Sequence, residues 1–132
     1  MTTDLLTIAK EIADRAEAES AKENVPVAVT VIDSHGNVVL THLMTGAPAF
    51  SLELAERKAY TSGLIRMRTA DLGPLVQPGA ELYPLLAVSG GRYSAMGGGV
   101  PLTNDEGEGI GGVGVSGGTT EQDIGIVEAA VS

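Results

Sequence analysis

Residues 109–123 read GIGGVGVSGGTTEQD, a glycine-rich run that leads into a helix-forming segment. Gly109, Gly111 and Gly114 match G-x-G-x-x-G, which binds a dinucleotide pyrophosphate when it lies inside a βαβ unit. Only eighteen residues follow Gly114, too few for a helix and a second parallel strand. We therefore expect no nicotinamide or flavin dinucleotide here. The glycines instead predict a strand that another backbone or a flat ligand approaches closely, followed by a terminal helix.

Size and composition limit what this chain can be. Its 132 residues fit one domain over 1–132, and with 43% apolar but only 3% aromatic residues the core must consist of small aliphatic side chains. Such a core buries limited area, which predicts a homo-oligomer. A net charge of −9, with Arg92 the only basic residue after Ala70, argues against nucleic acid and anionic membranes as partners. Without cysteine, a secretory leader or a long apolar run, a cytoplasmic protein is expected.

The residues upstream of the glycine-rich run predict a helix, a hairpin and a second helix. Apolar periodicity indicates a first helix that begins near Leu5 and ends at Asn24. Residues 27–33 and 38–44 are rich in β-branched side chains and flank the turn sequence SHGN, which is typical of a hairpin. Ser51 is expected to cap the second helix, one side of which carries Leu54, Lys58, Thr61 and Ile65.

The remaining segments predict the rest of the sheet. Residues 68–91, punctuated by proline and glycine, indicate a short helix at 69–72, a loop, and a strand at 85–88. Two more strands flank the turn NDEGEG at 104–109, and Thr119 or Thr120 caps the last helix. Strands joined by short turns form antiparallel sheets, so we expect an α+β fold with a five-stranded, mainly antiparallel sheet covered by helices.

Five sequence blocks together resemble a known family. They occur in the order and spacing of the GlcG/HbpS-like proteins, the haem-degrading domain family, to which the C-terminal domain of PduO-type cobalamin adenosyltransferases belongs. The blocks are VAVTVIDSHGNVV, AERKAYTS, PGAELYPL, GGGVPL and GIGGVGVSGGTTEQD. The resemblance runs from about Leu5 to Ala130. It implies a profilin-like or PAS-like layered domain and dimers that assemble into larger rings, such as tetramers or octamers.

The resemblance implies haem as a ligand, because some members bind it and one secreted branch degrades it. Other members belong to operons for glycolate, diol or glycerol metabolism. Family members typically carry Arg-Met-Asp before the Gly-Ala that precedes the second helix. This chain has Leu43, Met44 and Thr45 there, so a charged site in the hairpin does not carry over. The chain also lacks the export signal of the secreted branch.

Lys58 is the leading candidate for chemistry, because it matches the family's lysine in KAYT and lies on the inward side of the second helix. A lysine on such a face has a lowered pKa or an acidic partner. It either anchors a ligand carboxylate or acts as a base, or it forms a structural ion pair with Glu56, Asp123 or a neighbouring subunit. Tyr83 is either a hydrogen-bond donor to a ligand or a buried interface aromatic, and with Lys58 and Asp123 it forms the candidate catalytic set.

Two further groups are candidates for binding. His42, on the second strand, is a candidate axial haem ligand or a surface residue, whereas His35 lies in a turn and is expected to be solvated. The glycine-rich segments are candidates for holding a flat or anionic ligand, through close backbone approach or through free N–H groups at a helix start. These segments contain Gly97, Gly98, Gly99, Ser116, Gly117, Gly118 and Thr119.

An acidic pair on the second helix is a candidate cation site. Glu53 and Glu56 lie three residues apart on one helical edge. They either bind iron or another hard cation weakly, or form a solvated helix face on which Arg57 pairs with Glu53.

Three hypotheses about function follow. The first is a cytoplasmic, oligomeric small-ligand-binding protein, with haem or a related tetrapyrrole as the ligand. The second is a lyase, isomerase or hydratase that acts on an oxygenated organic acid with Lys58 and Tyr83. The third is an accessory subunit of a metabolic complex.

Overall fold

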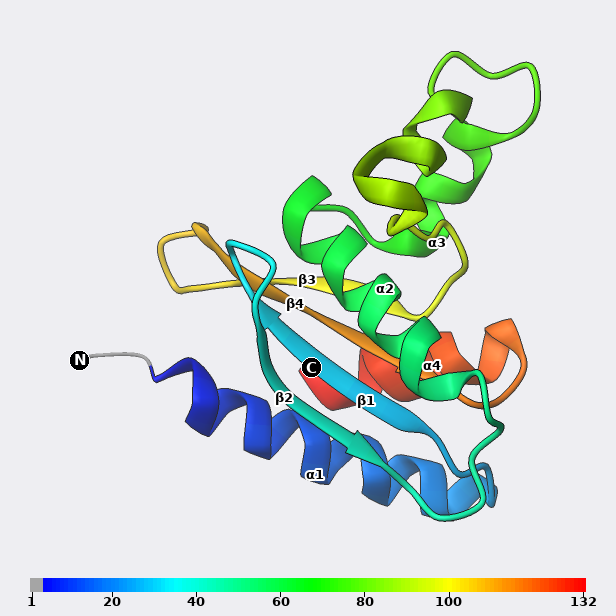
Figure 1. The fold of residues 1–132 in the computed structure, drawn as a ribbon. Coiled ribbons are helices and arrows are strands. Elements are labelled where there is room, and N and C mark those ends of the chain that lie inside the picture. Colours follow the sequence, from blue (N-terminus) through cyan, green and yellow to red (C-terminus); the bar gives the residue numbers. More distant parts are fainter. Residues whose placement is uncertain (1–3) are drawn as a thin grey trace.

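The computed structural model describes residues 4–132, and its centre is one antiparallel sheet. The sheet contains β1 (Ala28–Asp33), β2 (Val38–Leu43), β3 (Gly99–Thr103) and β4 (Gly109–Ser116). These strands lie in the order β2-β1-β4-β3, so β2 and β3 form the two edges (Figure 1).

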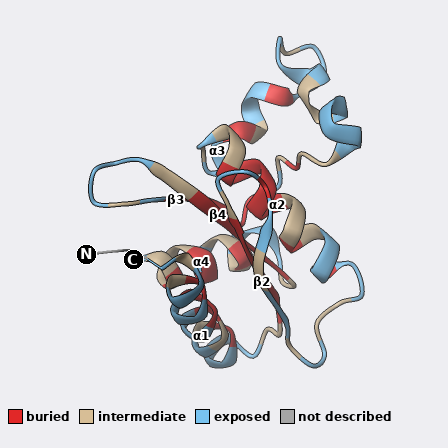
Figure 2. Ribbon diagram, turned by 60° about the vertical axis from the view of Figure 1, so that its left-hand side comes forward, coloured by how far each residue is buried: buried red, intermediate tan, exposed pale blue. Residues whose placement is uncertain are grey.

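Helices cover both faces of the sheet. Helix α2 (Ser51–Ile65) lies on one face, and α1 (Leu5–Glu23) and α4 (Thr120–Val131) lie together on the other (Figure 1). The short α3 (Thr69–Leu72) leads into a segment that projects from the end of α2. Figure 2 shows buried residues concentrated in the sheet and the helix surfaces that face it, whereas the projecting segment is largely exposed. None of the helices within residues 4–132 is long and apolar enough to cross a membrane.

Helix α1 forms as its sequence predicts. Asp4 caps it by accepting a hydrogen bond from the backbone N–H of Leu6, at 3.2 Å. It ends at Asn24, which adopts the left-handed conformation with φ of 56° and whose N–H bonds back to the last turn. Its buried residues recur at three and four and join the larger core cluster: Ala9, Ile12, Ala13 and Ala16.

The glycines of β4 are explained by α2. Val113 and Val115 belong to the core on the α1 and α4 side, so the alternate residues Gly112 and Gly114 face α2. A Cβ on Gly114 would lie 2.1 Å from the carbonyl oxygen of Ala55, far inside any allowed contact. The helix backbone therefore lies directly against the strand, which confirms the expectation of a close backbone approach.

The buried side of α2 differs from the prediction. The N-cap is Phe50, without a side-chain cap, and Ser51 is already helical, with its buried Oγ unpartnered among the described residues. Lys58 is buried as expected, but Leu54 is only half-buried. Thr61 is also buried as expected, and small residues at four-residue spacing share the inward side, because they allow contact with the glycines of β4: Ala55, Ala59 and Gly63.

The predicted strand at 85–88 is wrong, and the sheet has four strands instead of five. These residues belong to η2 (Tyr83–Gly91), a 3-10 segment that begins with Leu85 N–H bonding to Leu82 O at 2.9 Å. Leucine and alanine favour helical backbone over strand, and Pro84 fits the first helical turn. Positive φ values at Ser89 and Gly90 then reverse the chain, so the run cannot continue as an extended strand.

Candidate functional site

Lys58 and Asp123 form an ion pair inside the protein. Lys58 Nζ lies 3.0 Å from Asp123 Oδ2 and donates a second hydrogen bond to the carbonyl oxygen of Val115, at 2.9 Å. Lys58 is 1% exposed and Asp123 is 3% exposed. The ion pair with Asp123, one of the partners expected for Lys58, is therefore present, and it joins α2 to the first turn of α4.

The surroundings of this pair are closed to a ligand. Burial lowers the pKa of Lys58 below its usual range, and the nearby Asp123 carboxylate opposes that effect. The other oxygen of Asp123, Oδ1, accepts a hydrogen bond from the N–H of Gly118 at 2.9 Å. Two of the three Lys58 Nζ donors and both carboxylate oxygens of Asp123 are thus hydrogen-bonded within the protein.

Gly97, Gly98 and Gly99 pack against side chains and backbone of the protein itself. A Cβ on Gly98 would lie 2.8 Å from Lys58 Nζ, and one on Gly99 would lie 2.5 Å from the Lys58 carbonyl oxygen. A Cβ on Gly97 would lie 2.6 Å from Ile124 Cδ1. The space that a side chain would take at these positions is filled by α2 and α4.

The helix start after β4 satisfies its own N–H groups. Thr119 and Gln122 form a reciprocal capping box, and the Gly118 N–H is held by Asp123. Gly117 lies against the backbone of Pro26 and Val27, while the Oγ of Ser116 is buried without a partner among the described residues. The N–H groups of Gly118, Thr119 and Gln122 at this terminus are therefore already bonded within the protein.

Tyr83 and the acidic pair lie apart from Lys58. Tyr83 is exposed in η2, within the projecting segment of Figure 1, so the structure does not assemble it with Lys58 and Asp123. Glu53 Oε2 pairs with Arg57 Nη2 at 2.8 Å, and Glu56 Oε1 accepts a hydrogen bond from the side chain of Arg92. Across residues 4–132, no cluster of three or more histidine, aspartate or glutamate side chains could hold a metal ion.

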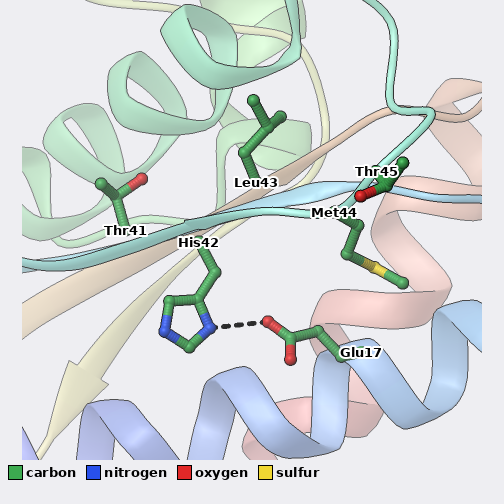
Figure 3. Close-up of a pocket in the computed structure, with 6 residues that line it drawn as sticks. All are labelled: Glu17, Thr41, His42, Leu43, Met44 and Thr45. Atoms are coloured by element: carbon green, nitrogen blue, oxygen red, sulfur yellow. Dashed lines mark hydrogen bonds and ion pairs between the residues drawn. The ribbon is translucent and has the colours of Figure 1, made fainter.

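An accessible polar pair lies instead between β2 and α1. His42 pairs opposite Val29 in the sheet and, like Val29, faces the α1 side. Its Nδ1 lies 2.7 Å from Oε2 of Glu17 on α1 (Figure 3). The His42 side chain is 44% exposed and that of Glu17 is 29% exposed, so solvent and ligands reach the pair. His35, in contrast, lies in the β1–β2 turn, as expected.

His42 and Glu17 line an open groove of about 650 Å³, the remaining walls of which come from neighbouring residues of β2: Thr41, Leu43, Met44 and Thr45. Met44 and Thr45 also line an adjoining hollow of about 300 Å³ beside the end of α1, so the two share a wall.

Glu17 is the residue of this site that the sequence did not indicate. It lies on α1 beside the buried Ala13 and Ala16, and it is 25 positions from His42. A glutamate on a charged helix face carries no signal in the sequence that distinguishes it from its neighbours. Only the packing of α1 against the edge strand brings its carboxylate to the imidazole.

Two relatives match most of this chain, but the match covers different shares of their own lengths. A 15.0 kDa protein from the dhaT–dhaS intergenic region of Citrobacter freundii is 40% identical over 131 residues, covering 99% of this chain and 92% of that protein. The corrinoid adenosyltransferase PduO of Salmonella typhimurium is 42% identical over 119 residues, which cover 89% of this chain. The match spans only 35% of PduO.

Solved structures have the same fold. The crystal structure of the PduOC:heme complex superposes with a TM-score of 0.92 at 36% identity, covering 99% of this chain and 94% of that one. The model of the family described as haem degrading protein HbpS-like matches residues 5–132. With nearly the whole chain matched and a relative 40% identical along its length, this protein belongs to the HbpS-like family.

Proposed function

We propose that this protein binds haem or a related tetrapyrrole in the groove between β2 and α1, with His42 as the axial ligand. The observation that carries the proposal is the Glu17–His42 hydrogen bond, which occupies Nδ1 and leaves Nε2, on the opposite side of the ring, without a protein partner among the described residues (Figure 3). A histidine that binds metal through one ring nitrogen usually bonds a carboxylate or carbonyl through the other.

The residues of the groove fit such a ligand. Its volume of about 650 Å³ lies within the range of roughly 300–1,000 Å³ that small-molecule sites occupy. Met44 offers apolar contact to a macrocycle on the same side of β2 as His42, and an imidazole is a common axial ligand of haem iron. The haem bound by the homologous PduOC domain supports the same ligand class for this chain.

The groove lacks one feature of many haem sites, because none of its lining residues is lysine or arginine. Thr45 supplies the hydroxyl available to propionates, because Thr41 Oγ1 is already hydrogen-bonded to Thr30 Oγ1 at 2.8 Å, and the open mouth of the groove leaves propionates in contact with water. Since unpaired carboxylates are best accommodated in water, we expect moderate affinity and tolerance of tetrapyrroles with different side chains.

Titration with haem, followed by Soret absorbance, tests the proposal. We expect a saturable, shifted Soret band for the wild-type protein and at least a tenfold loss of affinity for His42→Ala, which removes the axial nitrogen. His35→Ala is the matched control, because it removes the only other imidazole without touching the groove. A His42→Ala variant that binds haem as well as the His35→Ala variant would overturn the proposal.

We also propose that copies of the chain associate, as a dimer that builds a tetramer or octamer. The support is a set of large apolar side chains that are exposed near β2 and the start of α2: Val38, Leu43, Phe50 and Leu52. Burying such residues against another copy removes apolar area from water. Light scattering that gives the single-chain mass of 13.4 kDa at micromolar concentration would contradict this.

A further inference from the structure

We propose that Glu17 is a positioning residue that sets the orientation and the electron donation of His42, and so favours the ferric over the ferrous state of a bound haem. This inference rests on the proposed haem site. It concerns a property of that site, the redox equilibrium of the iron, which the presence of an axial histidine alone does not determine.

The first step is the tautomer of His42. An ionised carboxylate only accepts hydrogen bonds, so in the 2.7 Å contact with Glu17 Oε2 the His42 Nδ1 must carry the proton. In the neutral imidazole, the lone pair is then on Nε2. Glu17 thus selects the tautomer of the neutral ring that has its lone pair on Nε2, and holds the ring with Nε2 on the side away from the Glu17 carboxylate (Figure 3).

The second step is that Glu17 has no competing cation. Within residues 4–132, its ion pair is the one with His42, and the lysine nearest along α1, Lys22, pairs with Glu19 at 2.9 Å. Glu17 follows the buried Ala13 and Ala16 on a well-packed helix, which fixes the backbone that carries its carboxylate. The negative charge of Glu17 is therefore directed at the imidazole.

The third step is electronic. A carboxylate that accepts the Nδ1 proton makes the imidazole a stronger donor through Nε2. A stronger axial donor stabilises the more positively charged ferric iron more than the ferrous iron, and hydrogen bonding around the axial ligand is one of the ways in which a protein sets the haem potential. Glu17 is accordingly expected to lower the midpoint potential.

Redox titration of the haem-loaded protein tests this with Glu17→Gln, which keeps the size of the side chain and removes its charge. We expect about a tenfold smaller preference for ferric iron, which equals a rise of about 59 mV in the one-electron midpoint potential. The iron–histidine stretching frequency of the ferrous form should also fall, because the imidazole becomes a weaker donor. Glu19→Gln is the matched control, since it makes the same charge change two residues away on α1.

The outcomes separate this inference from the proposed function. If Glu17→Gln binds haem but shifts the potential and the stretching frequency no more than Glu19→Gln does, Glu17 has no positioning role and haem binding stands. If the wild-type protein shows no Soret band that depends on His42, the proposed function and this inference both fail.

Discussion

Two of the polar pairs that tie a helix to another element in this molecule differ in what can reach them. Lys58 and Asp123 join α2 to α4, with side chains 2% and 5% exposed. Glu17 and His42 join α1 to β2, with side chains 29% and 44% exposed. The first pair is buried and bonded to other groups of the protein, whereas the second leaves one ring nitrogen of His42 without a partner among the described residues.

The difference follows from position in the sheet. β4 is a central strand with β1 and β3 on either side, and its glycines let α2 pack so closely that Lys58 is enclosed. β2 is an edge strand, paired only with β1, and its outer residues are exposed. A charged side chain under a central strand thus serves the fold, while one on an edge strand is available for binding.

The largest expected effect on the free energy of unfolding is at the buried Lys58–Asp123 pair. Lys58→Met keeps the apolar length of the side chain but leaves the Asp123 carboxylate buried without its cation. Breaking a buried pair in this way costs about 3–5 kcal/mol of unfolding free energy. Urea unfolding, followed by circular dichroism, measures the loss.

A double variant identifies the cause. Combining Lys58→Met with Asp123→Leu removes both charges, and replacing a whole buried pair by apolar side chains is often close to neutral. The double variant should therefore recover much of the stability. If Lys58→Met alone has the same midpoint urea concentration as the wild type, the Lys58–Asp123 pair does not hold α2 to α4. The two pairs would then not differ in their contribution to stability.

The glycines that enclose Lys58 give the next effect. Gly114→Ala places a Cβ where the Ala55 carbonyl oxygen lies, so α2 must move away from β4, at a cost of about 1–3 kcal/mol or more. Gly125→Ala is the control, because Gly125 is exposed on α4, a Cβ added there would meet nothing within 4 Å, and alanine favours helix by about 1 kcal/mol. The midpoint temperature of thermal unfolding should fall for Gly114→Ala and rise for Gly125→Ala. Equal shifts would reject the close packing of α2 on β4.

The pKa of Lys58 predicts a smaller, pH-dependent effect. Burial lowers this pKa below 10.5 in the folded state, so between the folded and unfolded pKa values the unfolded chain holds more protons. Stability from this group therefore rises with pH through that window and levels off above 10.5. The difference in unfolding free energy between the wild type and Lys58→Met should grow from pH 7 towards pH 10, and a difference that shrinks would show the opposite shift.

The sequence predicted those parts of the fold that have a periodic pattern or a terminal signal. The three-and-four spacing of α1, the hairpin around SHGN and the Thr119 cap of α4 are confirmed. The strand at 85–88 was wrong because a four-residue apolar run has no period that separates strand from helix. On α2, Lys58 and Thr61 are buried as predicted, whereas Leu54 and Ile65 are only half-buried, since contact with the glycines of β4 favours small residues.

The candidate site was harder to predict, because its contacts join distant positions. Lys58 stood out as a charge on an inward face, but its partner Asp123 is 65 positions away and could not be chosen among several acids. His42 stood out as one of two imidazoles. Glu17, 25 positions from His42, did not stand out, because its role depends only on how α1 packs on the edge strand.

The smallest effect on stability is expected at the partly exposed Glu17–His42 pair. His42→Ala removes a hydrogen bond between two partly exposed side chains, and pairs of this kind contribute about 0–1 kcal/mol because water replaces the lost partner. Glu17 is not left buried by the change, so no desolvation penalty follows. Urea unfolding of His42→Ala should thus nearly match the wild type, in the same experiment that shows a large loss for Lys58→Met. A loss at His42 as large as the one at Lys58 would mean that the β2–α1 contact is also structural, and the haem affinity of His42→Ala would then report unfolding instead of ligation.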